Sequence, residues 1–326
     1  MSSGFDTYFG IVDEVTYGTP VAVTRFYEYV EGSEGIEGKY ERIESESFRA
    51  GQRTVHKDRF QPNPKGAEGD VELEVLDKSF GLLFKHMFGA VSTSGTGPYT
   101  HSFTVGDLAG QSFTAQVGRV QNDGTLIPFT YGGGKIDEWE LSNEVDGILI
   151  VKPKFDFASE HAGAGAGALA AQTPVYVTGA QLFTFAGGVV QIGGADFGVS
   201  KVNVKAKNGL KTDRYFMRTA GQTVKREPIE SEMRSYEFEL TGEFESLAHY
   251  QRIAAATASG TLANISMVWT SPAGSSVTVT VPYGRFDEGP VAASIEVAEH
   301  SMKGMCLSGD TGSPITLDYV TADATP

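Results

Sequence analysis

The sequence predicts a mainly β fold built from two tandem copies of one strand-rich unit, each with one flanking α-helix. Forty glycines and thirteen prolines separate short segments of alternating polarity, a composition typical of an all-β chain. One strand-helix stretch also occurs twice, about half a chain length apart. A chain of 326 residues with 40% hydrophobic side chains is long enough for two folded cores.

In the first copy, residues 69–90, apolar and acidic side chains alternate and a helical apolar stripe follows. The alternation, Val71-Glu72-Leu73-Glu74-Val75, has the period of a strand with one buried face. The stripe has the spacing of one helix face and consists of Phe80, Leu83, Phe84, Met87 and Phe88. The sequence predicts an N-cap at Asp77 and the end of the helix at Gly89.

The second copy, residues 236–255, has the same order of strand and helix. Tyr236, Phe238 and Leu240 alternate with glutamates, and Phe244 and Leu247 match Phe80 and Leu83. The strand offset is 236 − 71 = 165 and the helix offset is 247 − 83 = 164, whereas half of 326 is 163. We therefore expect a first domain at residues 1–162, a linker at 163–173 and a second domain at 174–326.

Polar segments precede both strand-helix stretches, at residues 48–70 and 218–235. Pro62 and Pro64 exclude a central strand from the first, so we interpret each segment as a long exposed loop or hairpin. Other strands are expected at residues 26–30, 99–105, 112–117, 126–131, 135–142, 148–158, 175–177, 182–185, 189–192, 199–207, 262–269, 277–281, 292–298 and 316–320.

The segment HAGAGAGALAAQT at residues 161–173 loosely matches the GxGxxG pattern of dinucleotide sites. Such a site needs a helix after the glycines and an acidic residue about 20 positions further on. Strands follow here, without a clear partner acid. The segment is therefore interpreted as the linker.

The net charge of −15 is unevenly divided, at −11 for residues 1–160 and −4 for the rest. A chain this acidic is a poor candidate for binding nucleic acid tightly, because phosphate contacts need lysine and arginine, although the chain could still surround nucleic acid. Cys306 is the one cysteine, which excludes a disulfide framework. We find no secretory signal and no apolar run of about 20 residues, and expect a protein made in the cytoplasm, with no membrane partner.

Two charged segments allow two interpretations each. The acidic segment Glu31–Glu46 is either a solvated surface or a docking surface for a basic partner. The basic segment Lys201–Arg226 favours an ion-paired protein contact over a single-stranded nucleic-acid site, because its only aromatic residues are Tyr215 and Phe216.

Catalytic and metal motifs are absent from the sequence. Gly309-Asp310-Thr311-Gly312-Ser313-Pro314 resembles two protease signatures, but it has threonine at the nucleophile position of one. The other needs two such aspartates, and only one copy exists. The six histidines have no metal-ligand spacing. We therefore expect no enzyme activity, no cofactor and no metal.

The chain resembles the tail tube (major tail) proteins of long-tailed, non-contractile bacteriophages. The resemblance rests on YGTP at 17–20, IESESFRAGQR at 43–53 and GDVELEV…SFGLLFKHMFG at 69–89, with FGVSKVNVKAKNG and YEFELTGEF in the second half. It implies two tandem tail-tube-type β-sandwich or barrel domains, a fused version of relatives with one tube domain per chain. It also implies a virion protein that is assembled in the host cytoplasm into stacked rings.

The resemblance further implies partners. Subunits would close a barrel around a lumen that holds the tape measure protein and later passes double-stranded DNA without specific binding. Tail terminator and distal tail proteins would bind the tube ends. One-domain relatives form rings of six, so two domains per chain predict a trimer with pseudo-sixfold symmetry. We expect a negative lumen, supplied by residues such as Glu72, Glu74, Glu237 and Glu239.

Two sets of contact residues are predicted. The inter-ring loops are expected at residues 54–66 and 219–230, with the contact residues Arg53, His56, Lys57, Arg59, Lys225, Arg226 and Glu227. Charge pairing between subunits is expected to join Glu37, Glu41 and Glu44 to Lys201, Lys205 and Lys207. The alternatives are another virion or needle-like tube component, an adhesive or carbohydrate-binding β-sandwich, or an enzyme. An adhesive platform would need exposed aromatics, whereas Trp139 and Trp269 lie in expected strands.

Overall fold

The computed structural model is mainly β, as predicted, and describes residues 4–163, 165, 167–217, 225–245, 247–255, 257–291 and 298–326. Its strands are β1 (Tyr8–Asp13), β2 (Arg25–Tyr27), β3 (Glu37–Glu44), β4 (Phe60–Asp70), β5 (Leu73–Glu74), β6 (Gly89–Ser94), β7 (Tyr99–Val105), β8 (Phe113–Val120), β9 (Leu126–Glu144), β10 (Ile150–Phe157), β11 (Ser159–Ala162), β12 (Gly188–Ile192), β13 (Ala195–Asp196), β14 (Val199–Lys207), β15 (Leu210–Lys211), β16 (Ile229–Glu230), β17 (Ser235–Glu243), β18 (Leu262–Thr270), β19 (Ser276–Glu288), β20 (Glu299–Leu307) and β21 (Thr316–Thr321). The α-helices are α1 (Gly81–Phe88), α2 (Leu247–Ile253) and α3 (Ala258–Thr261), and 3₁₀ turns occur at Gly4–Asp6 and Phe185–Gly187.

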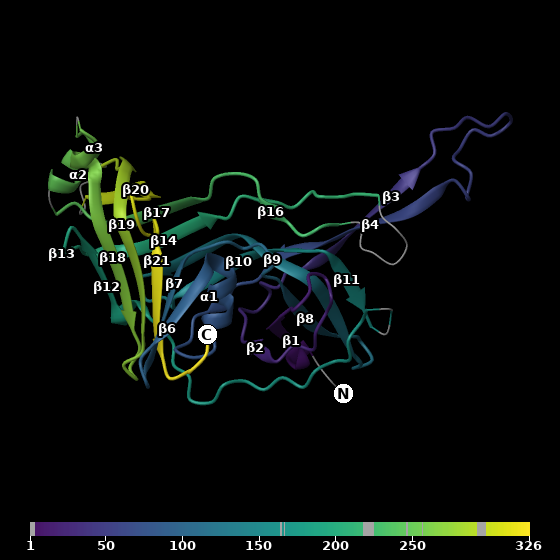
Figure 1. Ribbon diagram of the computed structural model, residues 1–326, viewed down its shortest axis with the longest axis horizontal. Coiled ribbons are helices and arrows are strands. Elements are labelled where there is room, and N and C mark those ends of the chain that lie inside the picture. The colour runs from purple at the N-terminus through teal and green to yellow at the C-terminus, as the bar shows by residue number, and fades with distance from the viewer. Residues whose placement is uncertain are drawn as a thin grey trace.

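One antiparallel sheet runs through both halves of the chain, and we call it the long sheet. Its strand order is β3-β4-β10-β9-β14-β17-β20-β19. The joint between the halves is the pairing of β9 with β14 (Figure 1). The first four strands and the last four therefore form two similar groups placed edge to edge.

Further strands fold over each group. In the first half, β2-β1-β8-β9-β11 forms a second sheet that shares β9 with the long sheet. In the second half, β19 pairs along one edge with β18, which leads to β12 and β13. The other edge of β19 pairs with β21, which leads to β7 and β6 of the first half. This last pairing ties the two halves together a second time.

Helix α1 is a core element, because all of its residues except Lys85 are buried. The ring of Phe84 lies 5.7 Å from that of Phe103 and 5.6 Å from that of Tyr319, a residue of the second half. Gly89 ends the helix with a φ of 95°, as predicted. The predicted cap at Asp77 is wrong: the N-cap position is Phe80, and the Asp77 carboxylate instead accepts the backbone N–H of Gln181.

The second strand-helix stretch forms with a different exposure. Strand β17 buries Tyr236, Phe238 and Leu240 as its alternation predicts, and α2 follows it. Unlike Leu83 in α1, however, Leu247 in α2 is exposed, and no residue of α2 is buried. The expectation of one equivalent flanking helix per half is therefore not confirmed.

The hydrophobic core is continuous from Phe9 to Tyr319, so the two halves share it. The expected linker leads into a segment that crosses the lower edge of Figure 1 between β11 and β12. The end of the expected linker contacts the first half, where the N–H of Gln172 donates to the Tyr8 hydroxyl at 3.0 Å. The predicted strand at 175–177 is wrong because these residues pair with no strand, and residues 292–297 of the expected strand 292–298 lie outside the described residues.

Candidate assembly surfaces

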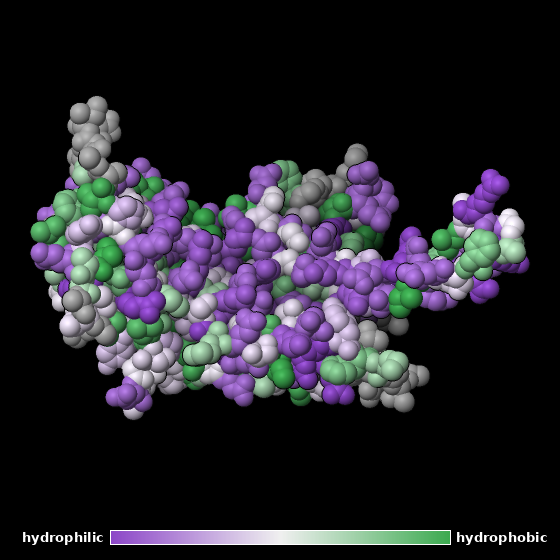
Figure 2. Space-filling model, turned by 90° about the horizontal axis from the view of Figure 1, so that it is seen from above, coloured by the Kyte–Doolittle hydropathy of each residue, from purple (hydrophilic) through white to green (hydrophobic). Residues whose placement is uncertain are grey.

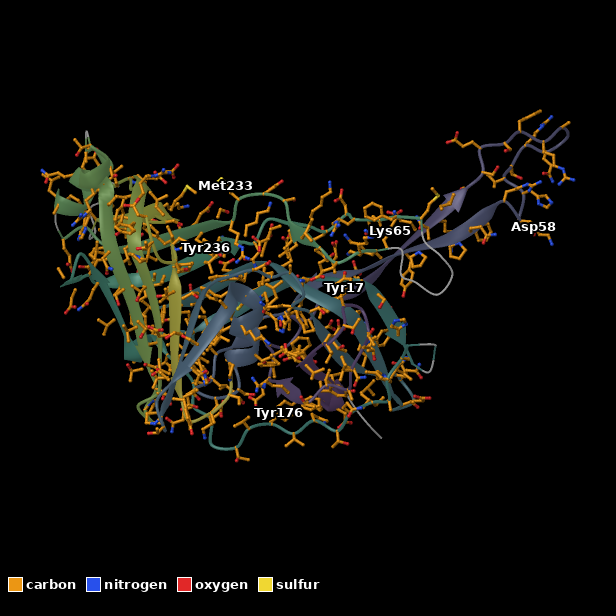
Figure 3. All side chains as sticks on the ribbon, viewed as in Figure 1. Tyr17, Asp58, Lys65, Tyr176, Met233 and Tyr236 are labelled. Atoms are coloured by element: carbon orange, nitrogen blue, oxygen red, sulfur yellow. The ribbon has the colours of Figure 1, made fainter. Side chains whose placement is uncertain are left out.

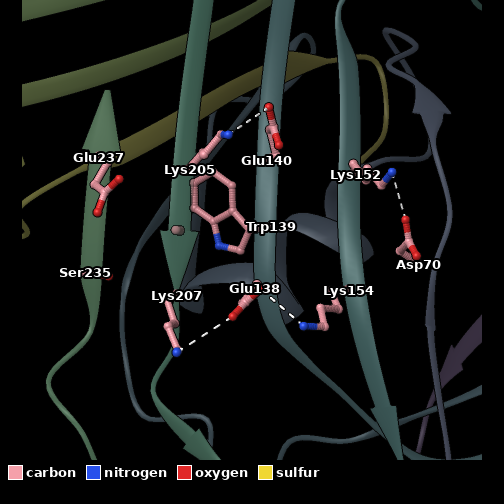
Figure 4. A pocket seen from close by; sticks show the side chains of 11 residues that line it. Asp70, Glu138, Trp139, Glu140, Lys152, Lys154, Lys205, Lys207, Ser235 and Glu237 are labelled. Carbon is pink, nitrogen blue, oxygen red and sulfur yellow. Dashed lines mark hydrogen bonds and ion pairs between the residues drawn. The ribbon is translucent and has the colours of Figure 1, made fainter. Parts of the chain in front are cut away.

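One face of the long sheet is covered with charged side chains, and we call it the charged face. Strand alternation produces it. In β9, Trp139 and Leu141 point into the core while Glu138 and Glu140 point outward, and in β10 Lys152 and Lys154 point outward. The hollow on this face, about 450 Å³ in volume, is lined by the residues in Figure 4: Asp70, Glu138, Trp139, Glu140, Lys152, Lys154, Lys205, Ala206, Lys207, Ser235 and Glu237.

Acidic and basic strands alternate across the charged face. The Nζ–O distances are 2.9 Å for Lys152 to Asp70 and to Glu72, 3.4 Å for Lys154 to Glu138, 3.7 Å for Lys205 to Glu140, 3.8 Å for Lys207 to Glu138 and 3.2 Å for Lys303 to Glu239. Glu72 and Glu239, which we expected to supply a negative surface, are thus paired with lysines. The charged face of a single chain is therefore mixed in sign, and a negative lumen stays a prediction.

Neutralising one charge of this face should change stability little. We expect Lys154→Gln to lower the free energy of unfolding by at most about 1 kcal/mol, because its pair with Glu138 is half exposed and screened by solvent. Urea denaturation of the variant and the wild type measures the difference. A loss above about 2 kcal/mol would show that the pairs act as a coupled network.

The predicted loop at 48–70 forms most of the turn and the second strand of a hairpin of β3 and β4, whose outer part projects from the molecule (Figure 1). Residues 67–70, at the inner end of β4, pair with β10 and belong to the long sheet instead of an exposed loop. We call residues 37–70 the arm and residues 45–59 its tip. No residue of the tip is buried, and its exposed apolar side chains include Phe48 and Val55. Figure 3 shows Asp58 in the projecting part of the arm, near the outer end of β4. Hydrophilic residues also run along the middle of the molecule and into the arm in Figure 2.

The corresponding segment of the second half, residues 208–234, lies differently, and we call it the strap. It connects β14 to β17, and its described part crosses the first half (Figure 1). The Tyr215 hydroxyl donates to the carbonyl oxygen of Lys65 at 2.9 Å. Glu227 forms an ion pair with Lys135 of β9 at 2.5 Å, and Lys225 forms one with Asp156 of β10 at 2.5 Å. The strap is therefore a contact between the two halves of one chain.

Burial determines the electrostatics under the strap. It raises the pKa of Asp156 to about 6, although the Lys225 ammonium opposes that shift. It also lowers the pKa of Lys135, against the effect of Glu227. Neither Lys135 nor Asp156 was a predicted site residue. The sequence did contain a signal for Lys135, because it is the single charged residue among the glycine and apolar residues of the segment 131–136. A charged residue in such a segment is expected to be buried only if it has an ionic partner.

The structure separates the predicted contact residues. Arg53, Lys57 and Arg59 are exposed at the arm tip with the half-exposed His56, whereas Lys225 and Glu227 are engaged with the first half and Arg226 stacks on Phe216. Glu37, Glu41 and Glu44 are exposed on β3. Lys205 and Lys207 pair with β9 of their own chain, and Lys201 is opposite Glu144 in the β9–β14 register. Contacts of these residues between subunits stay predictions.

Other features bear on the alternatives. Trp139 and Trp269 are both buried, so neither forms an exposed aromatic platform. In the described part of the chain, no three His, Cys, Asp or Glu side chains are grouped as metal ligands would be. None of the described helices has the length and apolar character required to cross a bilayer.

The chain matches a known protein family. The family model described as "Phage tail tube protein" matches residues 4–319, which is nearly the whole chain. No curated protein matches the sequence.

Proposed function

Since this chain belongs to the phage tail tube protein family, we propose that its long sheet joins those of other copies into rings that stack as the tail tube. The observation that carries this proposal is the joint between β9 and β14. There, the group β14-β17-β20-β19 continues the group β3-β4-β10-β9 through regular antiparallel pairing of residues 138–144 with 201–207. The same joint between chains would extend the sheet around a circle.

The outer edges of the long sheet are suited to that joint. Among the described strands, β3 pairs only with β4, so its other edge is open. At the opposite end, β18 pairs with β19 only as far as Arg285. On that side, residues 286–288 at the end of β19 pair with no described strand, while the other side of this end pairs with β20. Open edges tend to recruit further strands, and ring closure removes them. We infer that β3 of one chain pairs with this end of β19 in the next.

A closed ring then contains three chains. Each chain supplies two groups of four strands, and we propose that the groups are the two tandem tube domains, 1–162 and 174–326. Six groups per ring give a trimer with pseudo-sixfold symmetry. Head-to-tail contacts of this kind close into a ring when the rotation per group is 60°.

We propose that the charged face lines the lumen, since the opposite face of the sheet is committed to the core. Double-stranded DNA would pass it during ejection, and the tape measure protein would fill the lumen before that. Because each described lysine of Figure 4 lies near a carboxylate, few cations remain for lasting phosphate contacts. The proposal also includes tail terminator and distal tail proteins at the tube ends. The tube itself is structural, without enzyme activity.

Ring stoichiometry tests the proposal. We expect averaged cross-sections of assembled tubes, calculated without imposed symmetry, to show three chains and six similar wall segments. Negative-stain images of the purified protein should first show rings or tubes. Compact monomers under all conditions would favour an adhesive module instead. Six chains per ring, or a second half that projects from the wall, would contradict the trimer.

A further inference from the structure

A five-residue motif occurs at the same position of the long sheet in both halves. Gly134-Lys135-Ile136-Asp137-Glu138 lies in β9, and Gly284-Arg285-Phe286-Asp287-Glu288 lies in β19, with an offset of 285 − 135 = 150. In both strands the aspartate is the bulged residue without a cross-strand partner, and the residue before it is buried. The two motifs are therefore structurally equivalent, and we call them the first and second platform.

A second motif occurs in the strap and in the arm. The strap contains Thr223-Val224-Lys225-Arg226-Glu227, and the arm tip contains Thr54-Val55-His56-Lys57-Asp58, at an offset of 227 − 58 = 169. Ala-Gly-Gln precedes both, with Arg53 as one extra residue in the arm. Both segments also connect the first two strands of their four-stranded group. The arm tip is thus the counterpart of the strap.

Within the chain, the strap covers the first platform through specific contacts. Glu227 pairs with Lys135 at 2.5 Å and also accepts the N–H of Gly110 at 2.7 Å. The bulged Asp137 accepts the N–H of Leu210, near the start of the strap, at 3.2 Å. A covered platform therefore receives an acidic side chain from the motif and backbone N–H groups from the segment leading to it.

The second platform and the arm tip are not brought together within the chain. Arg285 is 41% exposed and its carboxylate partner is Asp287 of the same platform. Asp58 is 66% exposed on the arm tip, close to the outer end of β4, and its described partner is His56 of the same tip. Tyr283, beside the second platform, is also exposed. In Figure 1 the strap and the arm extend in the same direction, the strap over the first half and the arm beyond it.

We propose that the arm tip of one subunit covers the second platform of the neighbouring subunit in the same ring, with Asp58 paired to Arg285. This inference rests on the proposed ring, in which β3 follows β19 of the next chain as β14 follows β9 within a chain. The arm then repeats the contact that the strap makes. The partner is a second copy of this chain, and the contact runs around the ring instead of between rings.

Two residue differences between the strap contact and the proposed arm contact agree with the proposal. Under the strap, Lys225 pairs with Asp156, which lies opposite Lys135 in β10. At the equivalent positions, the arm has His56 and β20 has Met305 opposite Arg285. Both members of the Lys225–Asp156 ion pair thus have a different residue at the equivalent position, so the arm contact would not leave one member of that pair without its partner. By contrast, the Glu227–Lys135 pair corresponds to Asp58 and Arg285, which are again one acidic and one basic residue.

Cysteine cross-linking tests the contact. Full-length Asp58→Cys and Arg285→Cys chains are mixed, assembled and oxidised, and we expect disulfide-linked dimers. Burial raises the pKa of the native Cys306 thiol to about 12, so this thiol is a poor competitor. The matched control pairs Asp58→Cys with Lys154→Cys on the charged face and should give no dimer. In the double variant Asp58→Cys/Arg285→Cys, denatured products should stop at the number of chains in one ring.

The outcomes separate this inference from the proposed function. Tubes without the Asp58–Arg285 cross-link would overturn the contact and leave the tube intact, and products far longer than one ring would place the arm on another ring. A wild-type chain that forms no tube would refute the proposed function itself. Charge reversal adds a second test: Asp58→Arg or Arg285→Asp should each reduce the polymerised fraction about tenfold, and the double reversal should restore it.

Discussion

Lys225→Met is expected to lower the free energy of unfolding by about 3 kcal/mol, because it leaves the buried Asp156 carboxyl without its cation. Lys225 and Asp156 are both almost inaccessible to solvent, so water cannot replace the lost partner. Urea denaturation measures the change, and limited proteolysis shows whether the strap is released from the first half. A loss below about 1 kcal/mol would mean that the pair is dispensable.

The double variant Lys225→Met/Asp156→Leu is the matched control for that experiment. Replacing both members of a buried ion pair with apolar groups is often close to neutral, so most of the stability should return. The pH dependence supplies a second check. Because the folded-state pKa of Asp156 is raised to about 6, its favourable contribution is present at low pH and is lost as the pH rises through 6. The deficit of Lys225→Met should accordingly be smaller at pH 5 than at pH 7.

The strand pattern of this protein could be predicted well from its sequence, because buried and exposed side chains alternate in it. The alternations around Leu73 and Phe238 both lead into a helix, and Gly89 stops the first helix as expected. The charged face could be predicted in the same way, since its residues are the polar ones in the same alternation of buried and exposed side chains. The ion pairs between its neighbouring strands were not predicted, because the glutamates of one strand were considered without the lysines of the strands beside it within the same chain.

Long-range pairing accounts for what the sequence did not show. The strap and the arm occupy equivalent positions and carry related motifs, so both were expected to project. Only the fold reveals that the strap has the first half beside it, where Lys135 and Asp156 can pair with its charges. Likewise, the pairing of β7 with β21 joins segments more than 200 residues apart, which no local pattern indicates. The equivalence of α1 and α2 failed because the spacing of Phe244 and Leu247 does not determine burial.

Replacing the arm tip, residues 45–59, with an Asn-Gly turn is expected to abolish tube formation while the chain stays folded. Folding should persist because no tip residue is buried and the β3–β4 pairing ends at Glu44 and Phe60, where a two-residue turn can close the hairpin. Assembly should fail because the tip carries Asp58 and the apolar side chains that the proposed neighbour would cover. Circular dichroism and thermal melting check the fold, and sedimentation with negative-stain imaging checks the tubes.

The matched control shortens another exposed turn, residues 121–125 between β8 and β9, in the same way. That turn lies in neither the arm nor the platforms, so this variant should still polymerise. If the tip variant also formed long tubes, the arm would be unnecessary for both lateral and inter-ring contacts. If it formed single rings that do not stack, the tip would act between rings, as the sequence first suggested. Complete loss of rings would support the lateral contact. The proposed pairing of β3 with the end of β19 in the next chain is short, so it must be supported by the arm, which continues from β3.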